Sequence, residues 1–341
     1  GGATPRTRYQ QLLSTLRRAA GVPESLSAGG RFGAVDYRRM PATCRRVWGE
    51  KVYRKYDQEQ YDAFLAECKE ALRRGDKKGP KVHTGGLLPH TITAAAVAGD
   101  AAADLQWHGL VTRCAEARAR GEGCAGFVPV CDVSGSMSGE PMEVAVALSL
   151  LLAESAPKTS VLRGGMFTFH SKPTFVRLTV PDHEGGEVRD GALAERVRWV
   201  KSIEWGCSTN LDLVFDRIID MALTYSMPPE QVRRMAVVVF SDMEFDQGVA
   251  TRENAWETAH EAICNKFRLA GLGEVPPTIV YWNLRDSRSV PVEGTRRGVA
   301  MLSGFSSGLL ESFLEGKLDD FTPVRQMMKQ LERECYQRVV V

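Results

Sequence analysis

The pattern of apolar positions changes near residue 125 and divides the chain into two parts. Before that point apolar residues recur every three or four positions, which predicts helices over 8–20, 36–55, 57–74, 91–103 and 105–120. In the clearest of these, 57–74, one face carries Tyr61, Phe64, Leu65, Cys68 and Leu72. The basic stretch 73–81 is interrupted by Gly and Pro and is expected to be a loop. We therefore predict an α-helical module over residues 1–124.

After residue 125 short apolar runs alternate with helical stretches, which is typical of parallel strands joined by crossover helices. The runs predict strands over 127–133, 162–170, 173–180, 236–240, 278–283 and 299–303. The periodic stretches predict helices over 141–156, 192–203, 212–224, 253–270, 309–314 and 324–334. Residues 125–341 are thus expected to form an α/β domain with a mostly parallel, Rossmann-like sheet flanked by helices.

Composition places the chain among globular proteins, with 43% hydrophobic and 25% charged residues in 341. No apolar run approaches 18 residues, so no membrane span or membrane partner is expected. The eight cysteines are scattered, without a C-x-x-C pair or a zinc-site spacing. We interpret them as buried, reduced thiols, which favours a cytoplasmic or nuclear location.

The net charge of +2 is unevenly distributed along the chain. Residues 1–81 hold 18 basic and 9 acidic side chains, whereas the remainder holds 26 basic and 33 acidic ones. In the basic part, Tyr37, Trp48, Tyr53, Tyr56 and Tyr61 alternate with candidate RNA contacts: Arg38, Arg39, Arg45, Arg46, Lys51, Arg54 and Lys55. Cations beside aromatic rings suit phosphate contact and base stacking. The alternative is a solvated basic surface over helices whose aromatic residues form a core.

The most informative motif is Asp132-Val133-Ser134-Gly135-Ser136, which directly follows the apolar run 126–131. It places a carboxylate and two hydroxyls at the carboxyl end of a strand, where open α/β sheets bind ligands. Hard oxygen donors on one turn suit Mg²⁺. The alternative is that the two serines cap the helix that follows.

Two further segments extend this site. The glycine-led loop 206–210 contains Thr209 and Asn210, and Asp242 follows the apolar strand 236–240. In a doubly wound sheet both segments reach the same edge as Asp132. This set resembles the metal ion-dependent adhesion site of the von Willebrand factor A (vWA) domain. The resemblance implies five metal-site residues: Asp132, Ser134, Ser136, Thr209 and Asp242.

A site of this type combines neutral hydroxyl ligands with carboxylates that act through water, which leaves the cation electrophilic. An acidic side chain of a protein partner would then complete the coordination. We expect Mg²⁺, with Mn²⁺ as the alternative, and a rim formed by Gly135, Met137, Asn210, Glu244 and Asn283. For the rim residues, ordinary packing and solvated loop positions remain the alternatives.

The resemblance extends over most of residues 35–315. The stretches 85–90, 131–137, 240–245, 281–285 and 302–306 are similar to a plant and viral family of unknown function that joins a helical region to a vWA-like domain. Its layout is similar to that of the TROVE-module Ro ribonucleoproteins, in which a helical ring binds small RNAs. The helical part here, about 120 residues, is too short for a full ring. Binding of a small structured RNA is therefore the second hypothesis.

Enzymatic motifs are missing from the sequence. There is no G-x-x-x-x-G-K-[ST] phosphate loop. The segment Gly135 to Gly139 has Met137 where a nucleophile elbow needs serine. We therefore expect a binding protein and not an enzyme.

Overall fold

The computed structural model forms two compact units, and each is considered by itself. One comprises Gly1–Leu87 with Ala95–Gly109, and the other comprises Leu88–Ala94 with Leu110–Val341. The residues that the structure describes are 4–120, 126–132, 134–157, 160–168, 173–178, 192–203, 211–243, 255–285, 299–306, 309–310, 313, 327–328 and 331–332. Within these ranges, no helix is long and apolar enough to cross a membrane.

The first unit is helical. Its elements are α1 (Pro5–Ala19), α2 (Pro23–Ala28), the 3-10 turn η1 (Phe32–Ala34), α3 (Ala42–Trp48), the π-helical turn η2 (Gly49–Tyr53), α4 (Arg54–Tyr56) and α5 (Gln58–Arg73). The helices α6 (Pro89–Val97) and α7 (Ala103–Arg120) follow and contribute to both units. The prediction that this part of the chain is helical is confirmed.

The predicted continuous helix over 36–55 is wrong. Helix α3 begins only after Pro41, which serves as its N-cap, because proline lacks the amide hydrogen that a helix interior requires. At Gly49 the backbone changes to a π-helical turn. A Cβ at Gly49 would lie 2.7 Å from the hydroxyl of Tyr61, so only glycine lets this turn approach α5 so closely.

Aromatic side chains form the core of the helical unit. Tyr37, Tyr53 and Tyr61 are at most 5% exposed. Ring centroids of Tyr37 lie 5.7 Å from Tyr53 and 5.3 Å from Tyr61, in edge-on contacts. Such contacts stabilise a core beyond simple area burial. For these three residues the core alternative is therefore correct, and they are not available for base stacking.

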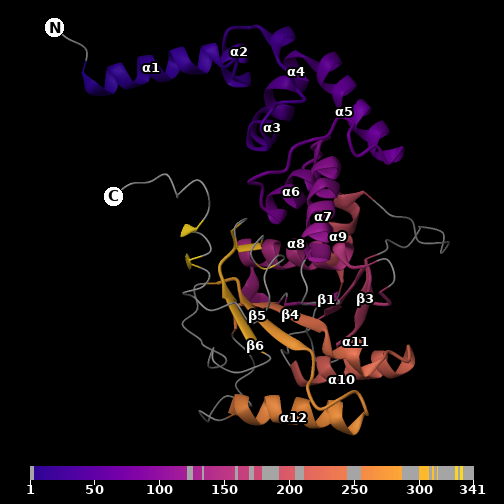
Figure 1. Cartoon of the computed structure of the whole chain (residues 1–341). Coiled ribbons are helices and arrows are strands. Elements are labelled where there is room, and N and C mark those ends of the chain that lie inside the picture. Colours follow the sequence, from indigo (N-terminus) through magenta and orange to yellow (C-terminus); the bar gives the residue numbers. More distant parts are fainter. Residues whose placement is uncertain are drawn as a thin grey trace. The chain divides into compact units, whose positions relative to one another are not determined.

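The second unit contains a six-stranded sheet in the order β3-β2-β1-β4-β5-β6 (Figure 1). The strands are β1 (Gly126–Cys131), β2 (Gly165–Thr168), β3 (Phe175–Arg177), β4 (Met235–Ser241), β5 (Thr278–Asn283) and β6 (Val299–Ser303). Only the β2–β3 pair is antiparallel. The expected α/β architecture with a mostly parallel, Rossmann-like sheet is confirmed, and β1 and β4 meet where the strand order reverses.

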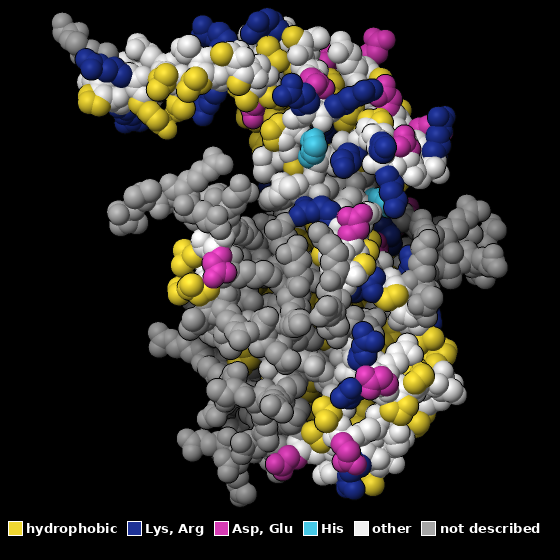
Figure 2. Space-filling model, in the orientation of Figure 1, with side chains coloured by type: hydrophobic (Ala, Val, Ile, Leu, Met, Phe, Trp, Pro, Cys, Tyr) yellow, Lys and Arg dark blue, Asp and Glu magenta, His cyan; other side chains and the backbone are white. Residues whose placement is uncertain are grey.

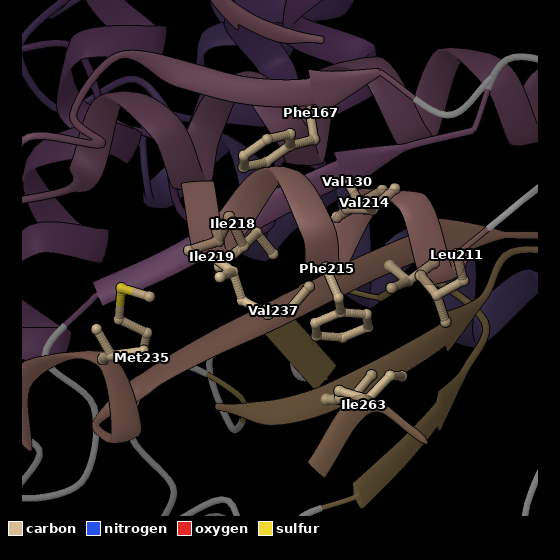
Figure 3. Close-up of a cluster of buried hydrophobic side chains, with 14 of the residues drawn as sticks. Val130, Phe167, Leu211, Val214, Phe215, Ile218, Ile219, Met235, Val237 and Ile263 are labelled. Carbon is tan, nitrogen blue, oxygen red and sulfur yellow. The ribbon is translucent and has the colours of Figure 1, made fainter. Parts of the chain in front are cut away.

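Helices around the sheet are α8 (Glu140–Ser155), α9 (Leu193–Ser202), α10 (Leu211–Thr224), α11 (Pro229–Arg233) and α12 (Ala255–Leu269). As its apolar sequence predicts, α8 is buried almost throughout and packs on β1 and β2. Residues of α10, among them Val214 and Ile218, pack with Val130 of β1 and Val237 of β4 (Figure 3). This core fixes the strands whose ends carry the candidate site. The predicted helices 309–314 and 324–334 lie mostly outside the described residues.

The edge pair β2–β3 depends on a glycine. A Cβ at Gly165 would collide with the ring of Phe175, which lies on β3 two residues before Arg177, the register partner of Gly165. We expect Gly165→Ala to lower the free energy of unfolding by about 1–3 kcal/mol, because the ring must leave its position. Gly126→Ala in β1 is the matched control, since a Cβ there meets nothing within 4 Å. Urea unfolding measures both, and equal midpoints would contradict this account.

Candidate metal centre

Two buried carboxylates lie at the point where the strand order reverses. Asp132 directly follows β1 and Asp242 directly follows β4, and both residues are fully buried. The register pairs Cys131 with Phe240, and the amide of Asp132 donates to the carbonyl of Phe240 at 3.0 Å. The two acids therefore follow neighbouring strands at one edge of the sheet, as the sequence predicted.

The loop after β1 gathers the predicted hydroxyls around Asp132. The Oδ1 atom of Asp132 accepts a hydrogen bond from the amide of Ser134 at 2.9 Å. The hydroxyl oxygens of Ser134 and Ser136 are 2.9 Å apart, and both residues are partly buried. The helix-cap alternative fails for α8, whose N-cap is Gly139 without a side-chain cap bond. Asp132, Ser134 and Ser136 thus form one hydrogen-bonded group.

Ser241 joins the two strand ends. Its hydroxyl donates to Oδ2 of Asp132 at 2.7 Å and accepts from the amide of Met243 at 3.1 Å. Ser241 is fully buried. Sequence reasoning gave it no role, although its position between a buried strand and Asp242 was the available signal. The second oxygen of Asp132 is therefore held by a residue 109 positions away.

Arg285 is the other residue that sequence reasoning missed. It comes just after β5, and its guanidinium Nη1 lies 3.8 Å from Oδ2 of Asp242. The same nitrogen donates to the carbonyl of Ser136. Its side chain is half exposed, whereas that of Asp242 is fully buried. The ends of β1, β4 and β5 therefore all contribute to the site.

Burial dominates the electrostatics at Asp132. Burial raises the pKa of Asp132, and the neighbouring charge of Asp242 raises it further. Hydrogen bonds from Ser241 and Ser134 lower that pKa but do not reverse its direction. A divalent cation would stabilise the ionised form of Asp132, because an opposite charge at close range favours ionisation.

The donor set fits Mg²⁺, which prefers oxygen ligands and keeps several waters. Carboxylates and hydroxyls supply those oxygens here. Among the residues that the structure describes, no three His, Cys, Asp or Glu side chains cluster as a metal site. The candidate centre is thus of the mixed hydroxyl and carboxylate type, with few acidic ligands.

The remaining predicted site residues have different outcomes. Thr209, Asn210 and Glu244 lie outside the described residues. Gly135 is exposed, in agreement with a rim position. Met137 is fully buried and supports the turn, so its rim assignment is wrong. Asn283 is 8% exposed, and its Oδ1 accepts from the amide of Arg285 at 3.0 Å, which makes it a support for that residue.

One of the proposed RNA contacts must be corrected. Arg45 is fully buried, donates from Nη2 to the carbonyl of Tyr37 at 2.6 Å and lies over the ring of Phe64. It therefore stabilises the core and cannot reach a ligand. Arg54 is partly buried and pairs with Glu50 and Asp62. The exposed candidates are Arg38, Arg39, Arg46, Lys51 and Lys55. Figure 2 shows Lys and Arg side chains interspersed with acidic ones on the visible face of the helical unit.

Removal of the Ser241 hydroxyl tests the link between the strands. We expect Ser241→Ala to destabilise the metal-free chain by about 1–3 kcal/mol, because a buried carboxylate oxygen loses its donor. Ser202→Ala is the control, since Ser202 is exposed and contacts only a carbonyl of its own helix. Urea unfolding in EDTA measures both variants. Equal stability losses would show that the Ser241 hydroxyl contributes no more to stability than the exposed hydroxyl of Ser202.

Both family models that match this chain describe domains of unknown function. Residues 127–338 match the model described as Domain of unknown function (DUF7788), and residues 3–119 match Domain of unknown function (DUF2828). "Uncharacterized protein L728" of Acanthamoeba polyphaga mimivirus is 28% identical over 341 residues. The match covers 97% of this chain and 55% of L728, so the chain spans about half the length of that relative.

A solved structure, that of the Deinococcus radiodurans RO (RSR) protein, matches with a TM-score of 0.39 and 16% identity. The match covers 88% of this chain and 48% of that one. A likeness at this level is too weak to support an inference about function. The expected kinship with a family of unknown function that has viral members is confirmed by the sequence matches. Because the DUF7788 model covers more than half of the chain, this protein belongs to the DUF7788 family.

Proposed function

We propose that the α/β unit is a non-enzymatic, metal-dependent binding module. Its divalent cation would be held by Asp132, Ser134, Ser136, Thr209 and Asp242, and would bind an acidic side chain of a protein partner. The observation that carries the proposal is the pair of fully buried carboxylates at the switch point, with two hydroxyls gathered beside them.

Charge and ligand type both support a cation at this place. Ionised carboxylates are costly to bury unless they are paired with positive charge. Arg285 supplies one positive charge near Asp242, and its side chain is half exposed, which weakens its effect. The hydroxyls of Ser134 and Ser136 are neutral ligands. A cation held largely by such ligands keeps much of its charge available for an anionic group of the partner.

Binding fits this site better than catalysis does. A serine nucleophile needs an adjacent base to accept its proton. Among the described residues, the hydroxyls of Ser134 and Ser136 contact each other and not a histidine or lysine nitrogen. In the described part of the chain, Arg285 is the basic group that contacts Asp242, and it stays protonated and cannot act as a general base.

Metal binding by the full chain is the direct test. We expect the protein to bind Mn²⁺, and Asp132→Asn or Asp242→Asn to weaken binding at least tenfold, because each removes a negative charge from the site. Asp220→Asn on the exposed face of α10 is the control. Free Mn²⁺ is measured by electron paramagnetic resonance. No binding at millimolar Mn²⁺, or equal affinity in all variants, would refute the proposed site.

A pocket in the helical unit favours RNA as a second candidate ligand. The pocket has a volume of about 450 Å³, and its lining is Glu24, Ser27, Ala28, Phe32, Trp48, Val52, Tyr53 and Tyr56. Phe32 and Tyr56 are stacked with ring centroids 5.7 Å apart. Trp48 and Tyr56 are 43% and 59% exposed, so both rings are accessible.

Positive charge lies next to these rings. The Nζ of Lys55 is 5.1 Å from the centroid of the Tyr56 ring, and Lys51 is exposed one turn earlier. Stacked aromatic rings beside cations suit an unpaired base and its phosphates. This combination, and not the buried tyrosines, is what supports RNA binding. Glu24 at the wall is an acceptor for a base amino group.

RNA binding is tested by fluorescence anisotropy of the full chain with a pool of small structured RNAs. We expect Tyr56→Ala to weaken binding about 5- to 100-fold, because a stacked base is lost. The double change Lys51→Ala and Lys55→Ala should reduce the salt slope by about two. Tyr225→Ala, an exposed tyrosine of the α/β unit, is the control. Absence of binding at about 0.1 M salt would eliminate this candidate.

A further inference from the structure

A guanidinium group lies inside the candidate metal centre, and the proposed function gives it no role. Nη1 of Arg285 is 3.8 Å from Oδ2 of Asp242 and donates a hydrogen bond to the carbonyl of Ser136. It thus joins the end of β4 to the loop after β1. The guanidinium therefore lies next to Asp242, which a divalent cation at this site would also need.

The backbone holds Arg285 in this place. The amide of Leu284 donates to the carbonyl of Ser241 at 3.0 Å, and the amide of Arg285 donates to Oδ1 of Asn283 at 3.0 Å. The carbonyl of Asn283 accepts from the amide of Gly304 at 2.9 Å. These bonds anchor the segment to the ends of β4 and β6, so the guanidinium is aimed at Asp242 by fixed structure.

We propose that Arg285 is a built-in counter-cation that competes with the divalent cation for Asp242. This inference rests on the proposed metal site and adds a regulation to it. Arginine cannot lose its proton in a protein, so its repulsion of a nearby cation is permanent. The chain therefore binds its metal weakly when no partner is present.

Charge counting shows how a partner would reverse this. When ionised, Asp132 and Asp242 give −2, and Arg285 brings the sum of these three groups to −1. A bound divalent cation changes that sum to +1, and an anionic group of a partner returns it to zero. Arg285 thus makes the metal-loaded site attractive to an acidic partner and makes metal retention depend on that partner.

The geometry favours this competitive role over a purely structural one. A structural ion pair would be expected to bury both partners, whereas half of the Arg285 side chain is exposed and Asp242 is fully buried. The backbone of Arg285 is anchored through its amide, which donates to Oδ1 of Asn283, whereas half of its side chain is exposed. The loop after β1 keeps its own bonds, from Ser134 to Asp132 and between the two serines.

Two substitutions separate charge from shape. Arg285→Gln removes the charge and keeps a side-chain donor for the carbonyl of Ser136, and Arg285→Lys keeps the charge and loses the planar fork. We expect Arg285→Gln to bind Mn²⁺ about tenfold more tightly than the unchanged chain, and Arg285→Lys to stay within about threefold of it. Arg217→Gln, an exposed arginine of α10, is the control and should have no effect.

The experiment is a Mn²⁺ titration of the full chain at about 0.1 M salt, followed by electron paramagnetic resonance, with thermal midpoints measured in EDTA. Tighter binding by Arg285→Gln than by the unchanged chain supports the proposal. Equal or weaker binding by a folded Arg285→Gln overturns it and leaves the metal site intact. No binding by any variant overturns the metal site as well. Arg285→Met is a second neutral variant if Arg285→Gln does not fold.

Discussion

The parallel pairing of β1 with β4 is the constraint on which the rest of the structure depends. All six residues of β1, from Gly126 to Cys131, are in register with β4 and buried. A shift by one residue would exchange the side chains between the two buried faces of the strand and disrupt the packing on both, so the register is strongly specified. With that register fixed, Asp132 and Asp242 must leave the sheet at the same edge. The site is therefore a consequence of core packing.

Burial of two carboxylates at this edge opposes folding, and the surrounding groups offset part of that cost. The Ser241 hydroxyl and the Ser134 amide hold the two oxygens of Asp132, and Arg285 lies beside Asp242. Burial still raises the pKa of Asp132 despite these hydrogen bonds. A site in this state is suited to take up positive charge from solution, and stability and binding then depend on the same groups.

Aromatic residues of the helical unit have two different environments. Tyr37, Tyr53 and Tyr61 pack against each other in the core, whereas Tyr56 and Trp48 remain accessible at the wall of a pocket. Sequence spacing does not separate these roles, because all five aromatic residues occur among the same basic side chains. The difference follows from tertiary contacts: the rings of Tyr37 and Tyr53 contact Tyr61 of α5, whereas the ring of Tyr56 stacks on Phe32.

The order of strands and helices and the group Asp132, Ser134 and Ser136 follow from the sequence, since these depend on neighbours within one or two turns of chain, whereas the strand ends do not: β2 is Gly165–Thr168 where 162–170 was expected. The tertiary structure alone decided which strands are adjacent. It therefore decided the contacts of Ser241 with Asp132 and of Arg285 with the Ser136 loop, which span 109 and 149 residues. It also placed Arg45 in the core, where its guanidinium lies over the ring of Phe64 and donates a hydrogen bond to the carbonyl of Tyr37. Charge and periodicity are local properties of a sequence, whereas burial and pairing depend on how distant segments pack.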